Sequence, residues 1–229
     1  MAFDYPVTLD LAGRRCLVAG DGPLALDRVE GLVASGAAVE LYAAAPAAEL
    51  AGAVVAHGVA HHARTLAPAD LDGAFLAIVT REDDADVAAL WDASREARVL
   101  FAALDDVPHC DFGAMSTIRR GDLRVTVSTA GRAPALAKRL RRRLETDVDE
   151  AYGELVERID AAKRRVGPRT VPFAAWAARW EEALADLDGL LELVRAGRAP
   201  EAEDRIVATI ADAGAGPVDD GPVSPDDAG

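Results

Sequence analysis

Residues 14–25 place glycines where the backbone could approach a phosphate group. An apolar run there leads into a Gly-x-Gly-x-x-Ala pattern, Gly20-Asp21-Gly22-Pro23-Leu24-Ala25. The first glycine allows a tight turn between strand and helix, the second lets the backbone approach a pyrophosphate, and the small third residue lets the helix pack closely on the strand. Unpaired N–H groups and the helix dipole favour an anion at this point. These six residues predict a dinucleotide site and redox chemistry, although tight turns that bind nothing share the pattern.

Histidine and cysteine do not form a metal-binding pattern in this sequence. His109 and Cys110 are adjacent on a predicted loop, and neighbouring loop residues rarely chelate one ion. His61 and His62 lie in a short predicted strand, where successive side chains point to opposite faces. We therefore expect no resident metal.

The elements around the glycine loop alternate between strand and helix. Short apolar runs predict strands, and stretches with helical periodicity predict the helices between them. Such alternation is typical of a parallel, doubly wound (Rossmann-like) sheet in an α/β fold, with ligands at the carboxyl ends of the strands. The expected strands are Arg14–Ala19, Ala38–Ala43, Val59–Ala63, Ala74–Thr80 and Val99–Leu104, and the expected helices are Pro23–Ser35 and Asp83–Ala97.

The pattern changes after residue 112. Two strand-like runs joined by Gly121-Asp122 predict a hairpin, and helices follow. We expect a dinucleotide-binding domain over 1–112, a hairpin-plus-helix segment over 113–146, a helical C-terminal domain over 147–213 and a disordered acidic tail over 214–229. The expected elements are the strands Ala114–Arg120 and Leu123–Ser128 and the helices Pro134–Thr146, Asp147–Val166, Phe173–Ala196 and Pro200–Ala213.

Composition indicates a soluble globular protein. The 229 residues are 51% hydrophobic and 28% charged, enough for one ordinary domain and a smaller one. Pro46 and Glu49 interrupt the alanine-rich stretch Ala43–Ala56, so we expect no membrane span, and nothing resembles a signal peptide. Cys16 and Cys110 are expected to be free thiols in a reducing cytoplasm. Lysine is rare, which fits either a salt-rich cytoplasm or the arginine bias of a GC-rich genome.

Charge is unevenly distributed along the sequence. The net charge of −14 argues against general nucleic-acid binding, because an acidic surface repels phosphates. Nine basic residues nevertheless fall between Ser116 and Arg143, against one acid, Asp122. This basic island predicts a docking site for a polyanionic small molecule. A solvated helix face or a dimer contact explains it too, and for Arg141–Arg143 the solvated face is favoured, because adjacent helix positions cannot all face one ligand. Nucleic-acid binding through the arginine-rich helix fits the island but not the overall charge.

Two motifs make this generic nucleotide-binding pattern more specific. They are Leu104–Phe112 (Leu-Asp-Asp-Val-Pro-His-Cys-Asp-Phe) and Gly121–Ala137, which contains Ser-Thr-Ala-Gly-Arg-Ala-Pro. Together with the opening Leu9–Arg14, they resemble the siroheme synthase N-terminal family, and the resemblance covers about Tyr5 to Leu144. It implies an NAD-dependent oxidation of precorrin-2, a tetrapyrrole, to sirohydrochlorin, and in some members insertion of Fe(II) to give siroheme. It also implies a homodimer, with 113–146 as the dimerisation and substrate segment.

The resemblance also implies roles for individual residues. The family's key aspartate corresponds to Asp105, and a carboxylate at a strand end beside the nicotinamide is a suitable general base. Capping of the following turn is the structural alternative for Asp105, and Asp106 is expected to be the turn residue. Thr80 corresponds to a position near the cofactor, although capping of the next helix is equally natural. The residues expected to face the tetrapyrrole or its carboxylates are Ser128, Thr129, Gly131, Arg132, Arg119 and Arg124.

The sequence departs from the family pattern at several positions. Asp21 stands where the glycine loop usually has a third glycine, and Asp27-Arg28 replaces a basic pair. Ala102 and Ala133 replace an asparagine and a serine. These departures support an alternative function, a regulatory module that senses NAD(H) without turnover.

The choice between NAD and NADP stays open at this point. The second predicted strand ends in Leu41-Tyr42-Ala43, without the acidic residue that commonly binds a ribose 2′-hydroxyl. NAD is the expected cofactor, NADP is not excluded, and Fe(II) is a possible substrate. The expected partners are a tetrapyrrole and a second copy of the protein, without nucleic acid or membrane, in the cytoplasm.

Overall fold

A computed structural model describes residues 5–80 and 86–212, which divide into two compact units. Among these residues, the first unit comprises those of Met1–Ala114 together with Thr129–Ala133. The second comprises those of Met115–Ser128 and Pro134–Gly229. The hairpin and the helices that follow it thus share one unit, whereas the turn Thr129–Ala133 belongs with the sheet.

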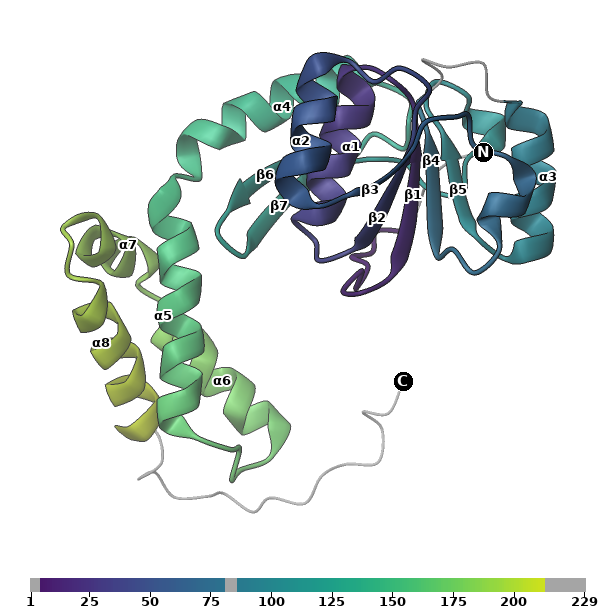
Figure 1. Cartoon of the computed structure of the whole chain (residues 1–229). Helices are drawn as coiled ribbons and strands as arrows, with labels where there is room; N and C mark the ends of the chain where they lie inside the picture. Colours follow the sequence, from purple (N-terminus) through teal and green to yellow (C-terminus); the bar gives the residue numbers. More distant parts are fainter. Residues whose placement is uncertain (1–4, 81–85, 213–229) are drawn as a thin grey trace. The chain divides into compact units, whose positions relative to one another are not determined.

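The first unit is built on a five-stranded parallel sheet with the order β3-β2-β1-β4-β5 (Figure 1). This order confirms the Rossmann-like sheet predicted from the alternation of strands and helices. The strands are β1 (Arg15–Ala19), β2 (Ala38–Tyr42), β3 (Ala60–His62), β4 (Leu76–Val79) and β5 (Leu100–Ala103). The helices are α1 (Pro23–Val33), α2 (Ala48–His57) and α3 (Val87–Ala97), with short 3-10 turns η1 (Pro68–Leu71) and η2 (Val107–His109).

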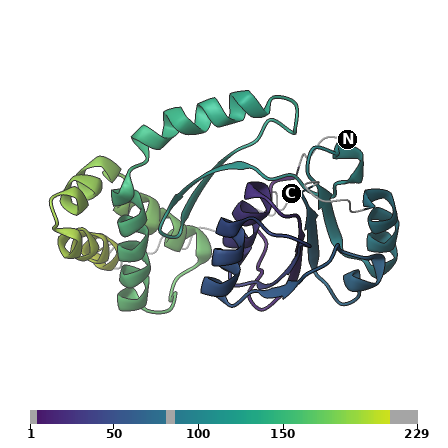
Figure 2. The same ribbon diagram turned by 45° about the horizontal axis from the view of Figure 1, so that its top comes forward.

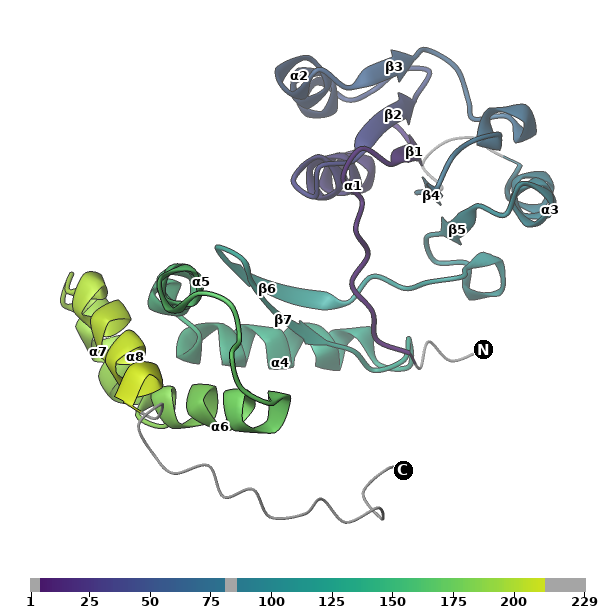
Figure 3. The same cartoon turned by 90° about the horizontal axis from the view of Figure 1, so that it is seen from below.

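Both faces of this sheet are covered, which explains why the central strands β1, β4 and β5 are nearly continuous apolar runs rather than alternating ones. Helices α1 and α2 cover one face, and η1 and α3 lie on the other (Figure 3). Cys16 and Val18 of β1 face the first core, and Leu17 and Ala19 face the second. All four are fully buried. The sheet is therefore a rigid base for the loops at its carboxyl edge.

Helix α2 is absent from the elements predicted from the sequence. It lies in the alanine-rich stretch, and only Leu50 and Val54 are buried along its length. Two large apolar side chains four residues apart give a weak periodic signal among alanines. Gly58, with φ of +65°, ends the helix in the left-handed conformation. The predicted start of α3 at Asp83 lies outside the described residues, and the cap of this helix is Asp86, which accepts a hydrogen bond from Ala89 N–H.

The second unit begins with the predicted antiparallel hairpin, whose strands are β6 (Ser116–Arg120) and β7 (Leu123–Val127). Helix α4 (Pro134–Asp147) runs along the hairpin (Figure 2). The remaining helices are α5 (Glu150–Val166), α6 (Phe173–Ala183), α7 (Leu187–Arg195) and α8 (Ala199–Asp212). They enclose a core that includes Leu155, Leu190 and Ile206.

The single helix predicted over Phe173–Ala196 is wrong, because the structure divides it into α6 and α7. The Asp186 carboxylate accepts a hydrogen bond from Gly189 N–H at 3.1 Å and so caps a new helix. Arg205 of α8 pairs with the same carboxylate at 2.6 Å and ties the break to the bundle. The predicted tail, 214–229, lies outside the described residues. Within the part of the protein that the structure describes, no helix combines the length and apolarity needed to cross a bilayer.

Candidate active site

The glycine loop leaves the carboxyl end of β1 in a conformation that only glycine adopts easily. Gly20 has φ of +148°, and its N–H donates to Tyr42 C=O at 3.1 Å. A Cβ atom on Gly20 would lie 1.8 Å from Thr80 Oγ1 and 3.4 Å from Ala25 Cβ. The absence of a side chain therefore lets β1, β4 and α1 converge at this loop.

Helix α1 begins directly after the loop. Gly22 is the N-cap residue and has no side chain of its own to cap this end, Pro23 occupies the first turn, and the first turn holds no acid. An acid at those positions would compete with a bound phosphate. Together with the tight fit at Gly20, this arrangement suits the pyrophosphate of a dinucleotide. Gly20, Asp21, Gly22, Pro23, Leu24 and Ala25, all predicted to bind the cofactor, form this single loop and first helical turn.

Thr80 lies behind the loop rather than in solvent. It is 3% exposed, and its hydroxyl donates to Ala19 C=O at 3.2 Å. Helix α3 begins at Val87, and its N-cap side chain is Asp86. The Thr80 side chain packs against Gly20 and constrains the path of the loop.

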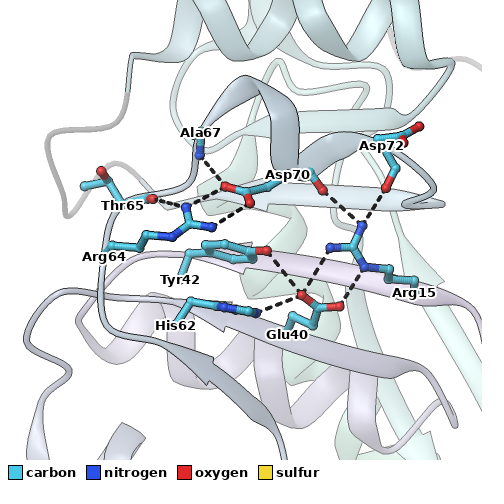
Figure 4. A network of polar contacts seen from close by, with 9 residues as sticks. All are labelled: Arg15, Glu40, Tyr42, His62, Arg64, Thr65, Ala67, Asp70 and Asp72. Atoms are coloured by element: carbon cyan, nitrogen blue, oxygen red, sulfur yellow. Dashed lines mark hydrogen bonds and ion pairs between the residues drawn. The ribbon is translucent and has the colours of Figure 1, made fainter.

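Glu40, the only acid in β2, belongs to a network of hydrogen bonds and ion pairs on the face of the sheet opposite α1 (Figure 4). The Glu40 carboxylate accepts hydrogen bonds from Arg15 at 2.6 and 3.1 Å, from the Tyr42 hydroxyl at 3.2 Å, and lies 2.9 Å from His62 Nε2. The His62 ring stacks on Tyr42. The Arg15 guanidinium is the main reason that the pKa of Glu40 falls to about 2. Burial raises the pKa of Tyr42 to about 12.

Asp105 follows β5 in a strained turn. Its φ is +62°, a left-handed value that costs most residues other than glycine about 1 kcal/mol and that Asp tolerates better than most. Asp106 N–H closes the turn on Ala103 C=O at 3.1 Å. The Asp105 side chain is exposed, and across residues 5–80 and 86–212 its carboxylate makes no hydrogen bond or ion pair. Asp106 lies 3.0 Å from His109 Nδ1 and begins the η2 turn.

Asp105 lines a cavity of about 180 Å³ at the carboxyl ends of β4 and β5. The wall is mostly apolar and includes Ile78, Ala102 and Phe112. Arg28 of α1 lines the same cavity, so a cation and a carboxylate both border a mostly apolar space. The Arg28 Nε atom is buried without a hydrogen-bond acceptor among the described residues. Sequence reasoning noted Arg28 only as part of an altered basic pair and did not predict it as a site residue.

The loop that carries Asp105 is anchored to β5 from its far end. Asp111 exchanges backbone and side-chain hydrogen bonds with Phe101, at 2.8 and 2.9 Å, and its carboxylate pairs with Arg95. The Cys110 thiol donates to Ala103 C=O at 3.1 Å, and burial raises its pKa. These contacts hold Asp105 at a fixed point of the cavity wall.

Three of the predicted substrate-binding residues lie in the turn that belongs to the first unit. Thr129 Oγ1 accepts a hydrogen bond from Ala133 N–H at 3.1 Å, and Thr129 C=O accepts one from Arg132 N–H at 2.9 Å. Ala130 and Gly131 both have positive φ, +52° and +76°. The turn leaves Gly131 and the side chain of Arg132 exposed.

The other three predicted residues lie in the second unit. Arg119 and Arg124 are direct cross-strand partners in the hairpin, and both are exposed. Like charges in this position repel each other, and a bound anion would relieve the repulsion. Arg124 also donates to the carbonyl groups of Gly121 and Leu123. Ser128, exposed, follows β7.

Histidines and acids do not gather into a metal site in the described part of the protein. No group of three His, Cys, Asp or Glu side chains there could hold an ion. His61 Nε2 lies 2.9 Å from Ala43 C=O, whereas the neighbouring His62 faces Glu40.

Comparison with known proteins agrees with this geometry. A family model for NAD(P)-binding domains matches residues 7–116, and one for the central part of sirohaem biosynthesis proteins matches residues 120–146. The fold and the glycine loop thus define a Rossmann-type protein of the nicotinamide-dinucleotide class. Siroheme synthase of Thiobacillus denitrificans is 35% identical over 210 residues, covering 92% of this chain and 43% of that protein. Siroheme synthase of Chromobacterium violaceum is 34% identical over 211 residues, covering 91% and 45%.

The chain belongs to the siroheme synthase N-terminal family. It spans less than half the length of the curated relatives it matches. Among solved structures, SirC, a precorrin-2 dehydrogenase, aligns with a TM-score of 0.64 over 91% of this chain and 100% of its own, at 21% identity. That likeness supports the fold of both units.

Proposed function

We propose that this protein oxidises precorrin-2 to sirohydrochlorin with NAD⁺ as the cofactor. The observation that carries the proposal is Asp105, an unpaired carboxylate among the described residues, held in a left-handed turn on the wall of a cavity at the carboxyl edge of the sheet. Family membership and the names of the relatives supply the substrate class. The glycine loop supplies a place for the dinucleotide.

The reaction removes two hydrogens from the substrate, one as a hydride and one as a proton. The bound nicotinamide supplies the hydride acceptor. Asp105 accepts the proton through its carboxylate, which has no competing donor among the residues that the structure describes. The backbone turn fixes the place of Asp105 on the cavity wall before the substrate arrives, which favours proton transfer. The wall of the cavity beside this carboxylate is mostly apolar, which suits the flat, apolar body of a tetrapyrrole.

Arginines supply the contacts to the acidic side chains of the substrate. Arg28 borders the cavity, its guanidinium pairs with the exposed Asp27 carboxylate at 3.4 Å, and a substrate carboxylate in the cavity would compete for the same cation. Arg132 in the turn, and Arg119 and Arg124 on the hairpin, are exposed cations suited to further carboxylates. In this proposal Ser128, Thr129 and Gly131 shape the turn against the tetrapyrrole.

The proposal extends to assembly, location and a second step. We assign dimerisation to residues 113–146, where α4 exposes Leu136, Leu140 and Leu144 at four-residue intervals. The two free cysteines support a reducing, cytoplasmic location. Fe(II) is assigned as a second substrate. The two pyrrole protons that insertion releases would pass one at a time through the Asp105 carboxylate to solvent.

The test is anaerobic incubation of the full-length protein with precorrin-2 and NAD⁺ or NADP⁺, followed through the absorption spectrum of sirohydrochlorin. Fe(II) is added afterwards to detect siroheme above the uncatalysed rate. Asp105→Asn should abolish turnover while nucleotide binding persists, because Asn also tolerates the left-handed turn. Asp92→Asn, an exposed acid on α3, is the matched control and should leave the rate unchanged.

An unchanged rate in Asp105→Asn would refute the assigned base. Nucleotide binding with no oxidation of precorrin-2 would instead identify a module that senses NAD(H), the alternative that the substitutions at Asp21, Asp27 and Ala102 support.

A further inference from the structure

The turn that carries Asp105 has to be held in place by the structure around it. The turn runs from Ala103 to Asp106 and closes through a hydrogen bond from its last N–H to its first C=O. Asp105, at the third position, has φ of +62°. A positive φ there is typical of type II turns and of glycine, and another residue persists in it only when the surrounding structure fixes the backbone. The contacts on each side of the turn therefore decide how well the Asp105 carboxylate is placed.

On one side, the turn is tied directly to the sheet. Leu104 N–H donates to Val79 C=O of β4 at 2.8 Å and so continues the pairing of β4 with β5. On the other side, the backbone returns to β5 after the η2 turn, and Ala102 and Cys110 form an isolated antiparallel bridge. Strand β5 is the last in the sheet, so this closure of the loop lies at the sheet edge. A single bridge at an edge needs further contacts to hold the loop firmly.

The Asp111 carboxylate supplies such a contact. Its Oδ2 atom accepts a hydrogen bond from Phe101 N–H at 2.9 Å, beside the hydrogen bond from Asp111 N–H to Phe101 C=O at 2.8 Å. Arg95 of α3 binds both oxygens of this carboxylate, with Nη1 2.8 Å from Oδ1 and Nη2 paired with Oδ2. A bidentate contact of this kind fixes the orientation of the carboxylate as well as its place. We call this ion pair the Arg95–Asp111 brace.

The arginine of the brace is itself held on α3. Its guanidinium lies 4.2 Å from the centre of the Trp91 ring and donates to Val99 C=O at 3.3 Å. The Trp91 ring also meets the ring of His109 edge to face, with the ring centres 5.7 Å apart. Trp91 thus contacts both the brace and the loop that the brace closes.

We propose that Arg95 is a positioning residue for the oxidation, which acts through Asp111 to hold the Asp105 carboxylate where the proton leaves the substrate. This role rests on the proposed function. The side chains of Arg95 and Asp111 are 43% and 20% exposed, so the brace adds little to the stability of the first unit. Proton transfer is more sensitive, because a misplacement of about 1 Å can lower a rate about 100-fold. Helix α3 would thereby affect the reaction although none of residues 87–97 lines the cavity.

Steady-state kinetics of the full-length protein tests this role. Arg95→Gln should lower kcat for precorrin-2 at least about tenfold, while KM for precorrin-2 and Kd for NAD⁺ stay within about twofold. Arg95→Lys keeps the charge but not the bidentate contact, so its kcat should lie between those of Arg95→Gln and the wild type. Arg98→Gln is the matched control. It removes an exposed cation at the end of α3 that makes no ion pair among the described residues, and it should leave kcat unchanged.

Two further measurements separate positioning from a general loss of structure. In Arg95→Gln, the amide hydrogens of residues 104–112 should exchange at least about tenfold faster, whereas those of β1 keep their protection and the urea midpoint of the first unit changes little. Asp111→Asn should reproduce the loss of kcat. The double variant should be no slower than the slower single variant, because both changes remove the same ion pair.

The outcomes distinguish this inference from the proposed function. An unchanged kcat in Arg95→Gln, or losses that multiply in the double variant, would overturn the positioning role and leave the dehydrogenase intact. A lower kcat without faster exchange in residues 104–112 would overturn it too, because Arg95 would then act elsewhere. If the folded wild type binds NAD⁺ but does not oxidise precorrin-2, the proposed function fails and this role fails with it. Arg95→Lys carries the same comparison if Arg95→Gln does not fold.

Discussion

The ion-pair network around Glu40 makes a prediction about acid stability. The carboxylate receives two hydrogen bonds from Arg15, one from Tyr42 and a contact from His62, and its pKa falls from 4.5 to about 2. At about 1.4 kcal/mol for each tenfold change in the acid constant, this difference corresponds to at most about 3.5 kcal/mol of stability. The side chains of Arg15 and Glu40 are 31% and 21% exposed, so solvent screening reduces it to about 2 kcal/mol.

The sign of the pH dependence follows from the direction of the pKa change. The pKa of Glu40 is lower in the folded protein than in the unfolded one, so the stabilisation is complete above about pH 5 and is lost as the pH falls towards 2. Glu40→Gln resembles the protonated acid at every pH. Its deficit in the free energy of unfolding should be about 2 kcal/mol at pH 7 and about half of that near pH 3.

Urea unfolding followed by Trp91 fluorescence measures this deficit in the first unit alone. Trp91 is the only tryptophan of that unit, so Trp176→Phe and Trp180→Phe remove the signal of the second. Glu30→Gln, an exposed acid with no ion pair among the described residues, is the control and should shift neither curve. A Glu40→Gln deficit that is constant between pH 7 and pH 3, or below about 0.5 kcal/mol at pH 7, would refute the reasoning.

Two glycines make further predictions. Gly20→Ala should destabilise the first unit by about 2–4 kcal/mol and abolish nucleotide binding, because φ is +148° and the new Cβ would meet Thr80 Oγ1. In a double-mutant cycle, adding Thr80→Ala should recover only the loss caused by the clash with Oγ1, and not the loss caused by the backbone angle. Gly153→Ala should destabilise the second unit by about 1–3 kcal/mol, because its Cβ would lie 2.7 Å from the backbone carbonyl carbon and oxygen of Arg120, and an unchanged urea midpoint would contradict this tight packing.

The parts of the fold that the sequence predicts well are those with a strong local signal. Strands β1, β2, β4 and β5 are short, mostly apolar runs, and the hairpin turns at Gly121-Asp122. Both features therefore lie in the structure within a few residues of the expected bounds. Helix α2 is not predicted, because alanines surround Leu50 and Val54 and leave no clear helical periodicity of large apolar residues. The break between α6 and α7 escapes because the cap formed by Asp186 depends on a hydrogen bond that no periodicity reveals.

The candidate site divides in the same way. The glycine loop and Asp105 stand in local motifs and are accessible from the sequence. Arg28 belongs to the cavity because α1 passes the ends of β4 and β5, and Glu40 is paired because Arg15 lies on the neighbouring strand. These two contacts depend on which elements become neighbours in the fold, and a single sequence does not reveal that order.

The path of the backbone between the two compact units bears on how such a protein can be recombined. Thr129–Ala133 belongs to the sheet unit although the hairpin before it and α4 after it belong to the other. The backbone therefore changes unit three times, after Ala114, after Ser128 and after Ala133. A single genetic crossover near residue 114 would carry a piece of the first unit away with the second. Two relatives can exchange whole units only if Thr129–Ala133 is exchanged together with the first unit. A chimaera joined at a single boundary should lose the match between this turn, which holds Arg132, and the sheet unit to which the turn belongs.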